Sequence, residues 1–292
     1  MTVIAPFTDT TKGALALLGA VAAWGSTFVV TKLLLVDIGP FTILALRFPI
    51  ALAVLVPFAR PQGFRMRMLV QPTFLLFGAS LAAHFGLQNL GLVYTTAGNA
   101  ALVVAGIPAV SALLSVLVLR ERLSARLKGG VFLSIAGVVL LTSAPIVAGS
   151  WSVLLGNVLV FGAVLTWALY TLQGKLLTHH HSALVAATAS TGAALVLLLV
   201  PFAWELSVRG LPQLSATGWA LIAYLGVVAS AVGFYLWNRG LHYVDAAAAG
   251  PFVNLVPVTG VMFALLLGER ITPVQVAGGM VVGLGVWLSH RG

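Results

Sequence analysis

The sequence predicts an all-α integral membrane protein with ten transmembrane helices, arranged as two inverted five-helix repeats. Three observations lead to this class. Of the 292 residues, 60% are hydrophobic and only 7% are charged, whereas a soluble domain carries about 25% charged residues. The apolar runs have the length of a helix that crosses a bilayer. The two halves of the chain also share one sequence pattern.

The apolar runs are long enough to cross a membrane as helices. A hydrocarbon core of about 30 Å needs about 20 helical residues. No run alternates apolar and polar residues as a transmembrane β-strand does. The first run is too long for a cleaved signal, so we expect it to be retained as a span. The spans are expected at about 13–35, 40–58, 70–93, 97–119, 127–146, 151–177, 182–204, 217–241, 246–267 and 273–289.

Basic residues gather in alternate loops, which orients the chain. With a cytoplasmic N-terminus, the inside segments hold eleven basic residues and the outside segments hold three. The inside set is Lys12, Arg60, Arg65, Arg67, Arg120, Arg122, Arg126, Lys128, Lys175, Arg239 and Arg291, and the outside set is Lys32, Arg209 and Arg270. This bias follows the positive-inside rule. We therefore expect a multi-pass protein of the cell (inner) membrane with both termini in the cytoplasm.

Two stretches of sequence recur about 145 residues apart. Trp24 and Lys32 match Trp167 and Lys175 at an offset of 143 residues. GLVYTTAGNAALVVAGIP at 91–108 matches GLHYVDAAAAGPFVNLVP at 240–257 at an offset of 149. Each half holds five spans, an odd number, so the second half enters the membrane from the opposite side. We expect a tail at 1–12, a first repeat at 13–146, a connecting loop at 147–150 and an inverted second repeat at 151–292.

Several motifs resemble the EamA-type members of the drug/metabolite transporter superfamily. They are WGSTFVVTK at 24–32, LRF at 46–48, and a proline-containing fourth span that ends in LRER and is echoed by LGER in the ninth. The resemblance covers essentially the whole chain and is greatest to the aromatic amino acid exporters. It implies ten helices in inverted repeats and the export or exchange of small metabolites, including amino acids.

Polar and deep aromatic residues within the spans are the candidates for contact with a substrate. A polar side chain in the bilayer needs a partner, a cavity or water. His84 and Gln88 are four residues apart and share a helix face, while Trp24 and Trp167 lie too deep for an interfacial belt. Hydrogen bonding between packed helices is the alternative for the polar members. The predicted substrate-binding residues are Trp24, Ser26, Thr27, His84, Gln88, Asn99, Trp167, Tyr170, Tyr235, Asn238 and Asn254.

Two prolines occupy matching positions near the centres of the fourth and ninth spans. A proline inside a helix frees the carbonyl four residues earlier, and paired breaks of this kind mark the binding region of inverted-repeat carriers. We therefore predict hinges at Pro108 and Pro257. A kink that serves only packing is the alternative.

Charged residues are almost absent from the span interiors. The carboxylates of Asp37, Glu121, Glu205, Asp245 and Glu269 fall at or near span ends, so we expect no carboxylate relay for protons or sodium. Arg47 lies well inside the second span. Its expected role is structural, bonding carbonyls or reaching an interface, with a substrate carboxylate as the alternative partner.

The sequence predicts no metal, no cofactor and no nucleic-acid partner. The chain has no cysteine, and the consecutive His179–His181 do not make converging metal ligands. The basic residues are explained by topology. Small residues four apart, Gly279 and Gly283 in the tenth span, indicate close helix contacts or a dimer seam. We expect the lipid bilayer and a small molecule as partners, and a monomer or weak homodimer.

These observations together predict a secondary transporter and no enzyme. It would export or exchange small organic metabolites, aromatic or other neutral amino acids first among them, by alternating access through a cavity between the repeats. A carrier for another metabolite or drug class is the alternative. An intramembrane lipid-modifying enzyme would need paired carboxylates, metal ligands or an activated nucleophile, which the spans lack. A channel differs from a carrier only in its flux kinetics.

Overall fold

The computed structural model describes residues 9–119, 150–244 and 268–290, together with scattered positions within 129–140 and 249–265. Every regular element within these residues is a helix. The first half contains α1 (Asp9–Trp24), α2 (Thr27–Leu34), α3 (Pro40–Ala59), η1 (Arg60–Gln62), η2 (Met66–Val70), α4 (Pro72–Tyr94), α5 (Ala97–Val104) and α6 (Ile107–Leu119). The second half contains α8 (Trp151–Thr178), α9 (Ala183–Arg209), α10 (Ala216–Tyr224), η3 (Leu225–Val232), α11 (Gly233–Tyr243) and α14 (Pro273–His290).

Six apolar segments of the described chain have the length and composition of membrane spans. They are Thr11–Leu34, Pro40–Gln62, Pro72–Tyr94, Trp151–Thr178, Ala183–Arg209 and Ala216–Tyr243. Two shorter apolar helices, Ala97–Ser111 and Pro273–Gly285, coincide with the fourth and tenth predicted spans. The fifth and ninth predicted spans fall largely outside the described residues. The prediction of a multi-pass helical membrane protein is thus confirmed, while the count of ten helices stays a prediction.

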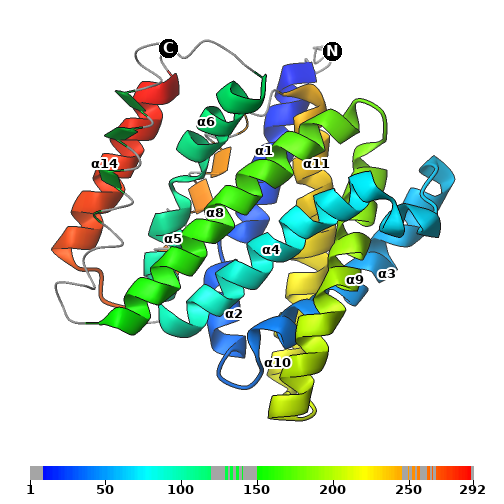
Figure 1. Ribbon diagram of the computed structural model, residues 1–292, viewed down its shortest axis with the longest axis horizontal. Coiled ribbons are helices and arrows are strands. Elements are labelled where there is room, and N and C mark those ends of the chain that lie inside the picture. Colours follow the sequence, from blue (N-terminus) through cyan, green and yellow to red (C-terminus); the bar gives the residue numbers. More distant parts are fainter. Residues whose placement is uncertain are drawn as a thin grey trace, which may run out of the picture.

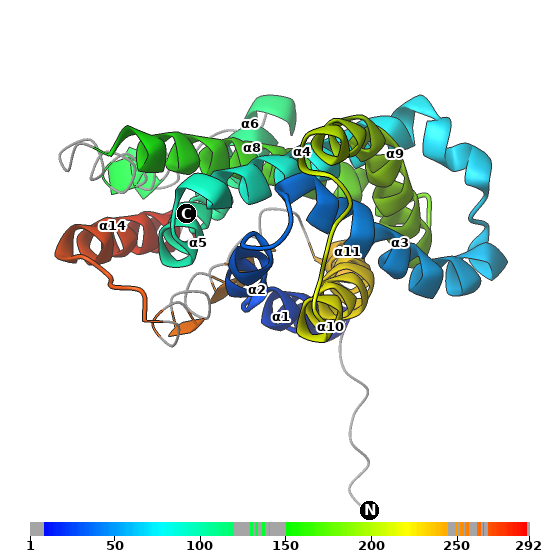
Figure 2. The same cartoon turned by 90° about the horizontal axis from the view of Figure 1, so that it is seen from below.

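The two halves are interlocked rather than placed side by side. The long helix α4 runs antiparallel alongside α8, and α1 runs along α11 (Figure 1). Helices α4, α8 and part of α9 form one layer, with α1, α2, α10 and α11 on its other side (Figure 2). The start of α1 and the end of α14 lie at the same end of the bundle, which we call the terminal end (Figure 1). The other end, where α2 stops and α3 begins, is the opposite end.

Two helices in the first half are broken near their middles. The first span bends at Gly25 and Ser26, between α1 and α2, and the fourth bends at Ala105 and Gly106, between α5 and α6. Pro108 is the second residue of α6, where a missing amide donor costs nothing. The helix of this span is therefore interrupted two to three residues ahead of the proline, and the role of Pro108 as a hinge stays a prediction. Pro257 lies outside the described residues.

The matched lysines of the two halves bind matching helix ends. Lys32 Nζ donates to the carbonyls of Leu92 at 2.6 Å and Thr95 at 2.8 Å, at the C-terminus of α4. Lys175 Nζ donates to the carbonyl of Val244 at 3.1 Å, just past the C-terminus of α11. A cation is favourable there because the last carbonyls of a helix are unpaired and carry partial negative charge.

Two carboxylates cap helix N-termini at the opposite end. Glu269 accepts the backbone N–H groups of Ala97 and Gly98 at the start of α5. Glu205 accepts the N–H groups of Phe41 and Thr42 at the start of α3. Glu205 lies near a span end, as the sequence indicates, but it is only 3% exposed. Its charge is stabilised by the first turn of a helix, which explains how an acid is tolerated there.

Candidate functional site

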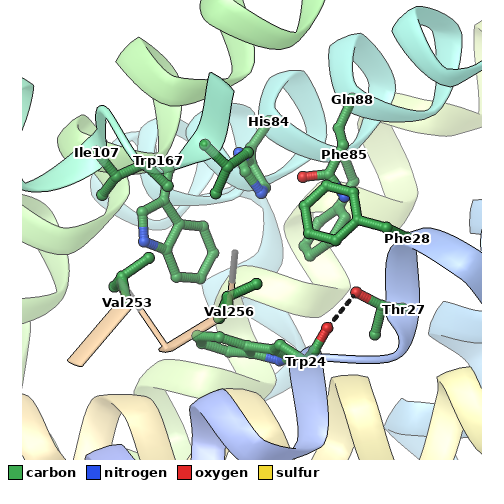
Figure 3. A pocket seen from close by; sticks show the side chains of 11 residues that line it. Trp24, Thr27, Phe28, His84, Phe85, Gln88, Ile107, Trp167, Val253 and Val256 are labelled. Carbon is green, nitrogen blue, oxygen red and sulfur yellow. Dashed lines mark hydrogen bonds between the residues drawn. The ribbon is translucent and has the colours of Figure 1, made fainter. Parts of the chain in front are cut away.

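A small cavity lies near the centre of the bundle, at the two broken helices. Its wall includes Trp24 from the end of α1, Thr27 and Phe28 from α2, and Val104 and Ile107 from the break between α5 and α6. The other lining residues are His84, Phe85 and Gln88 from α4, Trp167 from α8, and Val253 and Val256 (Figure 3). The cavity therefore draws on both halves of the chain. Both breaks place backbone bends directly in its wall.

The wall is mainly aromatic, and the two matched tryptophans meet in it. The ring centroids of Trp24 and Trp167 are 5.0 Å apart in an edge-to-face arrangement, which is the favoured geometry for an aromatic pair. Trp167 also contacts the imidazole of His84, at 4.7 Å between centroids. His84 in turn lies 4.7 Å from Phe85. The two indoles and the phenyl ring offer flat apolar faces to a ligand, beside the polar imidazole.

A few polar groups also lie in this aromatic wall. His84 Nδ1 donates to the carbonyl of Ala163 at 2.8 Å; because a carbonyl only accepts, Nδ1 carries a proton and Nε2 is left for another partner. The amide oxygen of Gln88 is directed toward the cavity (Figure 3). The Thr27 hydroxyl donates to the carbonyl of Trp24 at 2.8 Å and keeps its lone pairs available. None of the described lining residues is charged.

The indole nitrogens of the two tryptophans have different surroundings. Trp24 Nε1 donates to the carbonyl of Ala229 at 2.8 Å, in the π-helical segment η3. A Cβ at Gly233 would lie 2.5 Å from that nitrogen, so a glycine is needed for the approach. Trp167 Nε1 is buried with no hydrogen-bond partner among the residues that the structure describes, and it lies on the side of Val253 (Figure 3). It is the donor in the wall that a ligand or a rearrangement could satisfy.

Arg47 lies directly behind this wall. Its Nε donates to the Ser230 hydroxyl at 2.8 Å, and its guanidinium stands 4.7 Å from the ring centroid of Phe85, on which it forms a cation–π contact. The residue is 1% exposed. The structural role expected for Arg47 agrees with this placement, but the partners found among the described residues are a hydroxyl and aromatic faces and not carbonyls.

Five of the predicted substrate-binding residues line the cavity, namely Trp24, Thr27, His84, Gln88 and Trp167. Five others lie elsewhere. Ser26 bonds the hydroxyl of Tyr224 at 2.7 Å. Asn99 bonds Thr95 and Asn157 near the opposite end. Asn238 donates to the hydroxyl of Tyr170 at 2.9 Å in the interface of α8 and α11. Tyr235 lies in a surface groove with Arg239. Asn254 falls outside the described residues.

The distribution of these polar residues has a common physical reason. In an apolar bundle a buried amide or hydroxyl is stabilised by any polar partner across a helix interface, so polarity alone does not identify a cavity. Asn157, which the sequence reading passed over, is fully buried and accepts hydrogen bonds from Thr95 and Asn99. Phe28, Ile107 and the valines were also missed, because apolar lining residues give no distinct signal in an apolar span.

Comparison with known proteins identifies the family. The model of the EamA-like transporter family matches this chain twice, at residues 11–143 and 154–291. The chain belongs to the EamA-like transporter family. The double match agrees with the duplication that the sequence indicates, since one family unit covers each half.

Several relatives are similar over nearly their whole length. The "Uncharacterized transporter YetK" of Bacillus subtilis is 30% identical over 94% of this chain and 85% of its own. The "Probable amino-acid metabolite efflux pump" of Escherichia coli is 29% identical over 96% of this chain and 95% of its own. The "Probable terminal-alkyne amino-acid exporter" of Streptantibioticus cattleyicolor is 28% identical over 96% and 94%. A solved crystal structure has the same fold, with a TM-score of 0.68 at 19% identity over 96% of each chain.

Proposed function

We propose that this EamA-like transporter is a secondary carrier that exports or exchanges neutral amino acids, aromatic ones first among them. The observation that carries the proposal is the central cavity, where the matched Trp24 and Trp167 meet beside His84 and Gln88. Aromatic faces can contact the apolar or aromatic side chain of an amino acid, while an imidazole nitrogen and an amide can form hydrogen bonds with its amino and carboxyl groups. The relatives named as amino-acid exporters support the same substrate class.

The size of the cavity supports a carrier that opens and closes. Its volume is about 30 Å³, which is room for about one water, whereas ligand pockets measure about 300 to 1,000 Å³. A substrate therefore needs the walls to separate. The two helix breaks lie in the wall and supply the bends at which α2 and α5 move against α8. In this proposal the inverted repeats alternate between access to either face.

Transport in liposomes tests the proposal. Purified protein should exchange labelled phenylalanine or leucine for the same unlabelled amino acid by counterflow, with saturation. Replacing Trp167 by Ala removes a wall of the cavity and should raise the half-saturation concentration about tenfold or more, equivalent to about 1.4 kcal/mol. The matched control is Trp219→Ala, a tryptophan of α10 that is 48% exposed.

The same assay separates the alternatives. His84→Ala should lower transport, and His180→Ala, in the exposed loop after α8, should leave it unchanged. Saturation with counterflow is the behaviour of a carrier, and linear flux without counterflow would indicate a channel. Counterflow with other metabolites but with none of the twenty amino acids would assign a different substrate class. No flux of any solute in a broad panel would overturn the proposal.

A further inference from the structure

A continuous groove runs along the outside of the bundle at the terminal end. Two cavities of about 330 and 300 Å³ adjoin there and share Gln62, Leu184 and Tyr235 in their walls. They lie between the end of α3, the start of α9 and the length of α11. Each reaches the size at which small ligands are held. The groove is separate from the central cavity, and no described residue lines both.

The two halves of this groove differ in chemistry. The half toward the middle of the bundle is apolar and includes Val54, Phe58 and Val232, of which Phe58 is 66% exposed and Val232 is 42% exposed. The half at the terminal end contains Arg239 and His242. From Val232 to His242 the chain rises about 15 Å at 1.5 Å for each residue. That is about half the thickness of a hydrocarbon core.

The cation at the terminal end has no acidic partner among the described residues. Arg239 donates through Nη1 to the hydroxyl of Tyr235 at 2.6 Å, and its guanidinium stands 5.9 Å from the same ring. This contact uses one of five N–H donors and holds the arginine in the groove. His242 donates Nδ1 to the carbonyl of Thr178 at 3.1 Å, which leaves its other ring nitrogen for a second partner. Arg60 follows α3 at the same end and is exposed.

We propose that this groove binds one anionic phospholipid, with the phosphate at Arg239 and His242 and an acyl chain along Val54, Phe58 and Val232. Along the axis of the bundle, the basic half of the groove lies at the terminal end and the apolar half lies toward the middle. The headgroup and the acyl chains of a lipid in one leaflet lie in the same order. Basic pockets between membrane helices are known to hold acidic headgroups. A zwitterionic lipid matches the apolar half equally well but gives the guanidinium no net countercharge. The site does not depend on which solute is transported.

Lipid binding to the purified, delipidated full chain tests the proposal by native mass spectrometry. Phosphatidylglycerol should be retained about fivefold more than phosphatidylcholine of the same chains, since a basic residue near the headgroups contributes about 1 kcal/mol. Arg239→Gln should abolish this preference and Arg239→Lys should keep most of it. The matched control is Arg67→Gln, an exposed arginine of η2 outside the groove. Equal retention of both lipids by the wild-type chain would overturn the proposal. So would a loss of the phosphatidylglycerol preference in Arg67→Gln as large as the loss in Arg239→Gln.

A second set of measurements identifies the occupant. Val232→Trp fills the apolar half and should reduce the retention of both lipids, because the acyl chain is displaced. Glycerol 3-phosphate should not compete with phosphatidylglycerol, since it lacks the acyl chain. Full competition by glycerol 3-phosphate would replace the lipid with a soluble phosphate ligand. Unchanged retention in the Val232 variant would show that the apolar half holds no chain and would contradict the proposal.

Discussion

The capping of α3 by Glu205 makes a quantitative prediction about a glycine. The carboxylate accepts the N–H groups of Phe41 at 3.1 Å and Thr42 at 2.8 Å, together with the Thr42 hydroxyl. A Cβ built on Gly39 would lie 2.2 to 2.4 Å from all three carboxylate atoms, which no real contact allows. Gly39 has φ of −79°, so an alanine is compatible with its backbone. Gly39→Ala therefore acts by expelling the carboxylate.

The magnitude follows from the hydrogen bonds that are lost. An unsatisfied buried donor costs about 1 to 3 kcal/mol, so the loss of two N–H partners in Glu205→Ala should cost about 3 kcal/mol. Gly39→Ala should cost a similar amount, with a further 0.5 to 1 kcal/mol, roughly, for alanine as an N-cap. In the Glu205→Ala background the clash has already gone. Gly39→Ala should then cost only the N-cap part, which leaves a coupling energy of about 3 kcal/mol.

Unfolding in mixed detergent micelles, followed by the fluorescence of the seven tryptophans, measures this cycle. The control is Gly86→Ala, whose Cβ would make only an ordinary 3.5 Å contact with Phe41; it should not destabilise the protein, because alanine is the better helix former. Independent sites add to within about 0.5 kcal/mol. If the effects of Gly39→Ala and Glu205→Ala are additive within that margin, the carboxylate does not occupy this cap and the reasoning is refuted.

Three further substitutions test other contacts. Lys32→Met should lower the unfolding free energy by about 2 kcal/mol, since it removes charged hydrogen bonds to a helix end, while Lys12→Met in the exposed start of α1 should change it little. Gly233→Ala should displace the Trp24 indole from the Ala229 carbonyl. A change in the near-UV circular dichroism of the tryptophans, together with a loss of counterflow, would reveal this displacement. Asn157→Leu should destabilise the protein by about 1 to 3 kcal/mol by leaving buried donors unpaired; an unchanged midpoint would contradict that hydrogen-bond network.

The helices themselves were largely predictable from the sequence. The expected third span, 70–93, corresponds to Pro72–Tyr94, and the expected sixth, 151–177, corresponds to Trp151–Thr178. Both agree because the bilayer sets the length of an apolar helix. The breaks were not predictable in the same way. Gly25 and Gly106 are two of 31 glycines, and Pro49 and Pro57 remain inside α3, so neither residue type alone identifies a discontinuity.

The candidate site was predictable where the repeat or the spacing along one helix supplied information. Trp24 and Trp167 were paired by the offset between the halves, and their ring centroids lie 5.0 Å apart in the structure. His84 and Gln88 were paired by their spacing on one helix face. Tyr170 and Asn238 had no such constraint, and they bond each other at 2.9 Å behind the cavity. A single sequence does not contain the rotation of one helix about its axis relative to another, which decides such cases.

The two matched lysines connect the repeat to the proposed mechanism. From the sequence, Lys32 and Lys175 were expected to reach opposite membrane surfaces. The sequence did not predict their partners, which are 60, 63 and 69 residues further along the chain. The structure shows each lysine holding a C-terminal helix end of its own half. Because Lys32 lies at the opposite end and Lys175 at the terminal end, a lysine binds helix carbonyls at both ends of the bundle in this structure. In the proposed carrier, both lysine contacts occur together with a central cavity of only about 30 Å³. We therefore expect opening toward one face to release the carbonyls bound by the lysine at that end, while the lysine at the other end keeps its own.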